Sequence, residues 1–76
     1  MYSIIIVSSV TYAMKAKELL NNAGIHCRIE KVKKQFVQRG CTHGVIIKSS
    51  KLQNAKELLM SERIRIYDIL EQEDGT

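Results

Sequence analysis

Two segments of the chain are apolar at successive positions, which is the pattern of a strand buried on both faces. They are Tyr2–Val7 and Gly44–Lys48, and both are rich in isoleucine and valine. The segments 25–30 and 64–69 largely alternate apolar with polar residues, as strands do when one face meets water. The pattern therefore predicts four strands.

Apolar residues at helical spacing follow the first and third predicted strands, and each set forms one stripe. The first stripe is Ala13, Ala16, Leu19, Leu20 and Ala23, and the second is Leu52, Ala55, Leu58 and Leu59. Ser9 or Thr11 is expected to cap the first helix, and Ser50 with Gln53 matches a capping box for the second. Gly24 is expected to end the first helix, since a positive φ is cheap for glycine.

The pentapeptide Ala-Lys-Glu-Leu-Leu occurs twice, at Ala16–Leu20 and, 39 positions later, at Ala55–Leu59. It divides the chain into two halves that each read strand, helix, strand. Two split β-α-β units predict an α+β fold, a ferredoxin-like βαββαβ sandwich. Its four-stranded antiparallel sheet would carry both helices on one face, with the first and third strands at the centre.

The second face of this sheet would lie bare, although the central strands are apolar on both sides. A second copy of the chain is the simplest cover, so the sequence predicts a homodimer packed through its sheets. Residues 1–70 are expected to form a single domain. The acidic segment 71–76 has no apolar residue and is expected to fray.

Composition limits the class of protein further. Two cysteines in 76 residues do not suit a disulfide framework, so both thiols are expected to be reduced, as in the cytoplasm. No basic region precedes an apolar stretch at the Met1 end, and the run Ile4–Val7 is far too short to span a bilayer. A net charge of +4 is compatible with anionic partners.

Cys41 is the principal candidate for chemistry. It follows a basic stretch in the loop between the second and third predicted strands, and this topology hangs the loop over Ser8, Ser9 and the first helix N-terminus. Free helix N–H groups and nearby cations lower the pKa of a thiol and favour the thiolate. Gly40 and Gly44 on either side would let a partner approach closely. The cations of the stretch are Lys31, Lys33, Lys34 and Arg39.

Other interpretations of these residues remain open. Cys41 could be an incidental loop residue or a small buried hydrophobe. His43 would face the same way as Cys41 in extended backbone and could accept its proton, or it could be a solvated imidazole. Cys27 alternates with Ile25 and is expected to point into the core as an inert thiol. Zinc is not predicted, because Cys41 and His43 supply only two of four ligands.

Nucleic-acid binding is disfavoured. The basic stretch 31–39 could meet a phosphate backbone, but the central strands offer only Tyr2 as an aromatic platform. No glycine-rich phosphate loop separates a strand from a helix. No Ser/His/Asp set or carboxylate pair stands out, and no organic cofactor is expected.

The chain resembles a family of small bacterial domains of unknown function described as selenium/sulfur carrier-like proteins. The likeness covers roughly Tyr2 to Leu70. The chain departs from the family pattern near Cys41: Thr42 and His43 separate Cys41 from the next glycine, whereas in the family a glycine follows the cysteine more closely. The motifs that carry the likeness are Ile4-Ile5-Ile6-Val7-Ser8-Ser9, Ala13-Met14-Lys15-Ala16, Leu19-Leu20, Ala23-Gly24-Ile25, Gly40-Cys41 and Gly44-Val45-Ile46-Ile47.

The resemblance implies a sulfur or selenium carrier rather than a true enzyme. Cys41 would hold the atom with His43 beside it, Ser8 and Ser9 would stabilise the anion, and donor and acceptor proteins of sulfur or selenium metabolism would be the partners. The basic residues Lys33, Lys34 and Arg39 would steer those partners. The alternative is a non-catalytic dimeric module that grips a protein or small anion through its basic loop.

Overall fold

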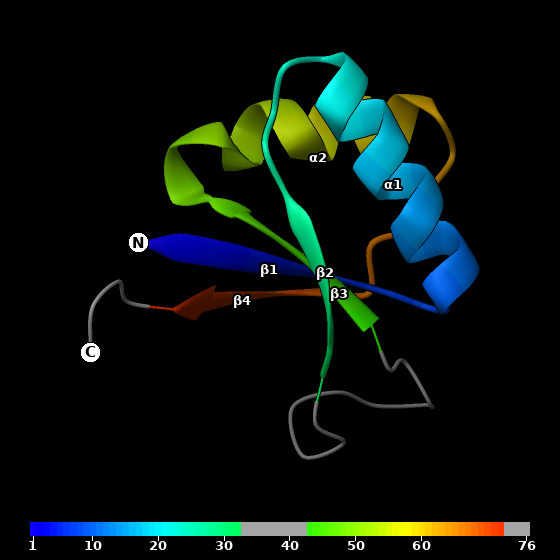
Figure 1. Ribbon diagram of the computed structural model, residues 1–76, viewed down its shortest axis with the longest axis horizontal. Coiled ribbons are helices and arrows are strands. Elements are labelled where there is room, and N and C mark those ends of the chain that lie inside the picture. The colour runs from blue at the N-terminus through cyan, green and yellow to red at the C-terminus, as the bar shows by residue number, and fades with distance from the viewer. Residues whose placement is uncertain (33–42, 73–76) are drawn as a thin grey trace.

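The computed structural model describes residues 1–32 and 43–72 (Figure 1). The described elements confirm the α+β class, with two α-helices and one four-stranded antiparallel sheet. In chain order they are β1 (Tyr2–Val7), α1 (Val10–Asn22), β2 (Arg28–Lys31), β3 (His43–Lys48), the short 3₁₀ helix η2 (Ser49–Lys51), α2 (Leu52–Ser61) and β4 (Asp68–Gln72).

The strand order β2-β3-β1-β4 puts the two apolar strands at the centre of the sheet, as the duplication predicts. β1 pairs antiparallel with β3 over six residue pairs, from Tyr2 with Lys48 to Val7 with His43. β4 and β2 pair with the outer sides of β1 and β3. Figure 1 shows both helices on the same side of the sheet.

The hydrophobic core lies between the sheet and the helices. Side chains alternate across a strand, so every second residue of β1 and β3 points towards α1 and α2. The predicted stripes supply the helical half, and burying each large aliphatic side chain contributes roughly 1.5–3 kcal/mol. The buried core residues are Ile5, Val7, Ala13, Ala16, Leu20, Ile25, Val45, Ile47, Ala55, Leu59 and Ile64.

The sheet face away from the helices is less bare than the sequence suggests. Ile6 of β1 is fully buried and Ile46 of β3 is 4% exposed, although neither belongs to the core under the helices. Ile4 and Leu70, which are register partners, remain partly exposed. A partner on this face would therefore meet a narrow apolar strip.

The ends of α1 follow the sequence closely. Ser9 is the N-cap and accepts a hydrogen bond from the Tyr12 N–H at 3.3 Å. At the other end Gly24 has φ +81° and donates to the Asn21 carbonyl at 3.0 Å. Ile25 then donates back to the Leu20 carbonyl at 2.8 Å, which closes the helix in a Schellman-type turn.

The end of α2 repeats this closure at the same offset of 39 residues. Ile64 donates to the Leu59 carbonyl at 2.9 Å, and Arg63 donates to the Met60 carbonyl at 3.0 Å. Arg63 has φ +62°, in the position that Gly24 occupies in the first half. An arginine thus adopts a left-handed conformation that ordinarily favours glycine.

These two closures correct the predicted starts of the edge strands. Ile25 and Ile64 each complete a helix end and are buried under it, so neither begins a strand. β2 starts at Arg28 and β4 at Asp68, each later than the alternation indicates. The alternating pattern detects which side chains are buried but does not distinguish a ladder from an extended connection.

The predicted capping box of the second helix is wrong. Ser49–Lys51 wind into η2, and the Leu52 N–H donates to the Ser49 carbonyl there. α2 therefore begins at Leu52, and its N-cap Lys51 makes no side-chain hydrogen bond. Gln53 instead donates its amide to the Glu57 carboxylate at 3.3 Å, one turn along α2.

A polar cluster ties β4 to the rest of the sheet, and the sequence pattern gives no sign of it. The Ser3 hydroxyl is buried and lies 2.7 Å from Ser49 Oγ and 3.1 Å from both carboxylate oxygens of Glu71. Ser49 donates to the same carboxylate at 2.9 Å. β4 includes Glu71 and Gln72, which pair with Ser3 and Tyr2 of β1, so the strand extends into the segment expected to fray. Residues 73–76 lie outside the described part.

The matching turns that end α1 and α2 predict that removing the glycine from the first and introducing a glycine into the second have opposite effects on stability. Gly24→Ala should lower the free energy of unfolding by about 1 kcal/mol, because a Cβ disfavours positive φ. No atom lies within 4 Å of a Cβ at this site, so the backbone conformation alone is tested. Arg63→Gly should raise the stability by a similar amount. Urea unfolding measures both, and a shift of the same sign in the two variants would contradict the shared turn.

Candidate functional site

The end of β1 leads directly into the start of α1 through Ser8 and Ser9. The Ser9 hydroxyl accepts from the Tyr12 N–H, and the Ser9 carbonyl accepts from the Ala13 N–H at 3.0 Å. The earlier amides of the helix, those of Val10 and Thr11, have no partner within a helix. The first turn of α1 carries no acidic side chain. Its N–H groups and dipole therefore favour an anion at this end of the molecule.

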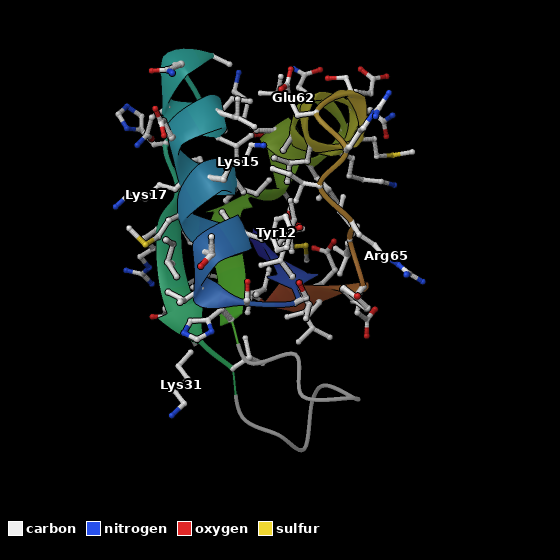
Figure 2. All side chains as sticks on the ribbon, turned by 90° about the vertical axis from the view of Figure 1, so that its right-hand side faces the viewer. Tyr12, Lys15, Lys17, Lys31, Glu62 and Arg65 are labelled. Atoms are coloured by element: carbon white, nitrogen blue, oxygen red, sulfur yellow. The ribbon has the colours of Figure 1, made fainter. Side chains whose placement is uncertain are left out.

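His43 begins β3 at the same end of the sheet. It stands opposite Val7, the last residue of β1, and opposite Lys31, the last residue of β2. Its side chain is half-buried. In Figure 2 Lys31 lies at the end of the molecule where α1 begins. The pairing of β1, β2 and β3 thus gathers an imidazole, an ammonium group and the start of α1 at one end of the sheet.

Three of the seven predicted site residues lie in the described part of the chain, and the structure brings them to this one end. They are Ser8, Ser9 and His43. Cys41 and the predicted partner-steering residues Lys33, Lys34 and Arg39 lie outside the described residues. The expected loop position of Cys41 therefore stays a prediction.

Gly44 has a packing role that the sequence interpretation missed. It is buried in β3, and a Cβ built on it would overlap Cγ2 of Ile4 and lie 3.0 Å from Cγ2 of Val32. Both contacting groups belong to branched side chains with little freedom to move. The glycine is thus needed to let Ile4 and Val32 close over the sheet, and it does not leave the backbone open to a partner.

Cys27 is a structural cysteine, as its spacing predicts. Its half-buried side chain packs against the core, and its Sγ lies 3.8 Å from the Lys17 carbonyl and 3.8 Å from Asn21 Oδ1. Burial raises the pKa of the Cys27 thiol, and the nearby Lys17 charge opposes that shift only in part. The thiolate, which is the nucleophile, is therefore disfavoured at this position.

Two exposed tyrosines near the start of α1 were not anticipated as surface features. Tyr12 in the first turn is 46% exposed and Tyr67 is 43% exposed. Tyr67 donates its N–H to the Ile6 carbonyl at 2.9 Å, and the Arg65 guanidinium lies 5.0 Å from its ring centroid. Figure 2 shows Tyr12 and Arg65 on the same side of the molecule. Tyrosine and arginine are enriched where proteins dock, so their exposure here is compatible with a partner.

Other kinds of site find no support among residues 1–32 and 43–72. Within these ranges no group of three His, Cys, Asp or Glu side chains is arranged to hold a metal ion. No described helix is long and apolar enough to cross a membrane.

The packing around Gly44 generates a direct test. Gly44→Ala should lower the free energy of unfolding by about 1–3 kcal/mol, because Ile4 and Val32 must shift to admit the methyl group. The double variant Gly44→Ala/Ile4→Leu, which removes the Cγ2 methyl branch at the contact, should recover part of that loss. Urea unfolding measures both. Equal stability of wild type and Gly44→Ala would show that the site is not tightly packed.

Comparison with known proteins identifies the family to which this chain belongs. The search of curated proteins and the search of solved structures each found no match. The comparison with protein families matches residues 2–71 to the family described as "Putative Se/S carrier protein-like". The match covers all of the described helices and strands except Gln72, the last residue of β4. The chain therefore belongs to the selenium/sulfur carrier-like family.

Proposed function

We propose that this protein carries sulfur or selenium on Cys41 and passes the atom to a partner enzyme. The family description supports a carrier of these elements. The observation that carries the proposal further is the β1–β3 register, which sets His43 beside the strand that leads into Ser8, Ser9 and α1. Cys41 precedes His43 by two residues, so chain connectivity keeps their Cα atoms within about 7 Å of each other.

The surroundings of this strand end suit a bound anion. The first amides of α1 lack helical partners, and the first turn has no acidic side chain to compete. Lys31 adds a positive charge at the end of β2. A thiolate, or a persulfide anion, within reach of these groups is stabilised relative to its protonated form.

The transfer step needs no external oxidant or reductant. The Cys41 thiolate attacks the terminal sulfur of a donor persulfide, a new S–S bond forms, and the donor S–S bond breaks. The donor leaves as its thiolate, and the terminal sulfur stays on Cys41 as a persulfide, which loses its proton to become an anion. An acceptor thiolate then repeats the exchange on the Cys41 persulfide and frees the Cys41 thiolate. A terminal selenium atom would follow the same route.

Each remaining site residue has one task in this proposal. His43 accepts the proton of the Cys41 thiol, and the hydroxyls of Ser8 and Ser9 donate to the terminal anion. The loop cations Lys33, Lys34 and Arg39 steer acidic surfaces of the donor and acceptor proteins. The reaction needs reduced thiols, so the cytoplasm is the proposed compartment.

Intact-protein mass spectrometry tests the carrier role. After incubation with a cysteine desulfurase and cysteine, the wild-type protein should gain the mass of one sulfur atom, which a reductant then removes. Cys41→Ser should gain nothing. Cys27→Ser is the matched control and should load as wild type, because its thiol is disfavoured as a nucleophile. Loading of Cys41→Ser, or absence of loading in all three proteins, would contradict the proposal.

We also propose that two copies associate through the sheet face away from the helices. Ile4 and Leu70 form a partly exposed apolar pair on this face, next to the buried Ile6 and Ile46. Replacing Leu70 by Lys should break the association, because it would bury a charge in the interface.

Sedimentation velocity at micromolar concentration should give a dimer for wild type and a monomer for Leu70→Lys. Met60→Lys is the control, since Met60 is 65% exposed on α2, on the other side of the sheet, and its replacement should leave the dimer intact. A monomeric wild-type protein would contradict the dimer without bearing on the carrier role.

A further inference from the structure

A basic cleft lies at the end of the sheet opposite His43. It is a hollow of about 590 Å3 where β1 begins and β3 ends, and its lining includes Tyr2, His26, Arg28, Lys48 and Lys51. β3 spans six residues, so about 17 Å of strand separates Lys48 from His43. The cleft is therefore distinct from the end of the molecule to which the carrier role is assigned. It lies towards the β2 edge of the sheet, whereas Leu70 of the proposed dimer contact lies in β4 at the other edge.

The cleft exists because the β2–β3 ladder stops early. Arg28 is paired with Ile46, and it is the first paired residue of β2. Continuing the register would set Cys27 opposite Ile47 and His26 opposite Lys48. Residues 25–27 instead leave β3 because Ile25 closes the end of α1. The departure opens a gap that Ile46 and Ile47 line and that basic side chains surround.

The charge around this gap is of one sign. Arg28, Lys48 and Lys51 are exposed cations, and none of the described residues that line the cleft is acidic. The Glu30 carboxylate lies 3.8 Å from the Arg28 guanidinium. Both side chains of that pair are more than half exposed, at 72% and 52%, so water screens it strongly. The cleft thus keeps a net positive potential.

The volume of the cleft and the aromatic side chains that line it indicate which class of ligand it could bind. Its volume lies within the range of roughly 300–1,000 Å3 that small-molecule sites occupy. Guanidinium and ammonium groups together suit the closely spaced oxygens of phosphate groups. Tyr2 and His26 add planar rings beside the cations, which suits a flat ring on the ligand.

We propose that this cleft binds a nucleotide unit through its phosphate groups and its base. Arg28, Lys48 and Lys51 hold the phosphates, and Tyr2 stacks on the base. The same chemistry is present in a free nucleotide and in a nucleic-acid strand, and the experiment separates these two sources.

Calorimetric titration with ATP at low ionic strength tests the phosphate contacts. Wild type should bind saturably, and Lys48→Gln/Lys51→Gln should weaken the affinity by about tenfold, because two phosphate contacts are lost. The matched control is Lys15→Gln/Lys56→Gln, which removes the same charge from α1 and α2 at two residues that do not line the cleft. The control should stay within about twofold of wild type. Equal losses in the two double variants, or no saturable binding by wild type, would overturn the site.

Two further binding measurements test the role of Tyr2 and the independence of this site from Cys41. Tyr2→Leu should weaken ATP binding while leaving inorganic pyrophosphate binding unchanged, since pyrophosphate has no base to stack. An unchanged ATP affinity would overturn the stacking role. Cys41→Ser should bind ATP as wild type does, so this result is independent of the carrier role.

A decathymidine strand is the second probe. Binding of the strand no tighter than ATP, with both lost in Lys48→Gln/Lys51→Gln, would support a site for free nucleotides. Tighter binding of the strand, lost in the same variant, would support a site for a nucleic-acid strand. Strand binding that survives the variant while ATP binding does not would overturn the strand as a source.

Discussion

The antiparallel pairing of β1 with β3 is the constraint on which the rest of the structure depends. The two strands are continuous apolar segments, so both must lie at the centre of the sheet, and their register fixes what stands at each end. At one end it sets His43 against Val7, next to the start of α1. At the other it sets Tyr2 against Lys48, beside the basic cleft. A slip of one residue would turn every side chain of one strand to the wrong face.

The duplication explains how so short a chain builds two layers. Each half closes its helix with the same pair of backbone hydrogen bonds and then sends an isoleucine, Ile25 or Ile64, under the helix end. These closures delay the edge strands. In the first half, the late start of β2 leaves the cleft beside β3. In the second half, the Tyr67 N–H already donates to the Ile6 carbonyl of β1, one residue before β4 begins. The same local device thus has different consequences in the two halves, because the residues around it differ.

Sequence reasoning reaches the class, the strand order, the helix stripes and the caps Ser9 and Gly24, because periodicity and glycine chemistry are local signals. It fails where tertiary contacts decide. Arg63 takes a glycine-like conformation without being glycine, and Ser3 looks like an interruption of an apolar strand although it binds Glu71. Gly44 looks permissive to a partner although Ile4 and Val32 fill the space above it. Ser8, Ser9 and His43 lie at the same end of the sheet because His43 pairs with Val7, whereas the loop that contains Cys41 lies outside the described residues.

The central claim is that the transferred atom is held at the end of the sheet where β1 passes into α1. Heteronuclear NMR of the protein before and after sulfur is loaded on Cys41 tests it most directly. The account predicts that the largest amide shifts fall on residues 8–12 and on His43, since these groups surround the new anion. Shifts confined to Tyr2, Lys48 and the far end of the sheet, or spread evenly over the chain, would contradict it.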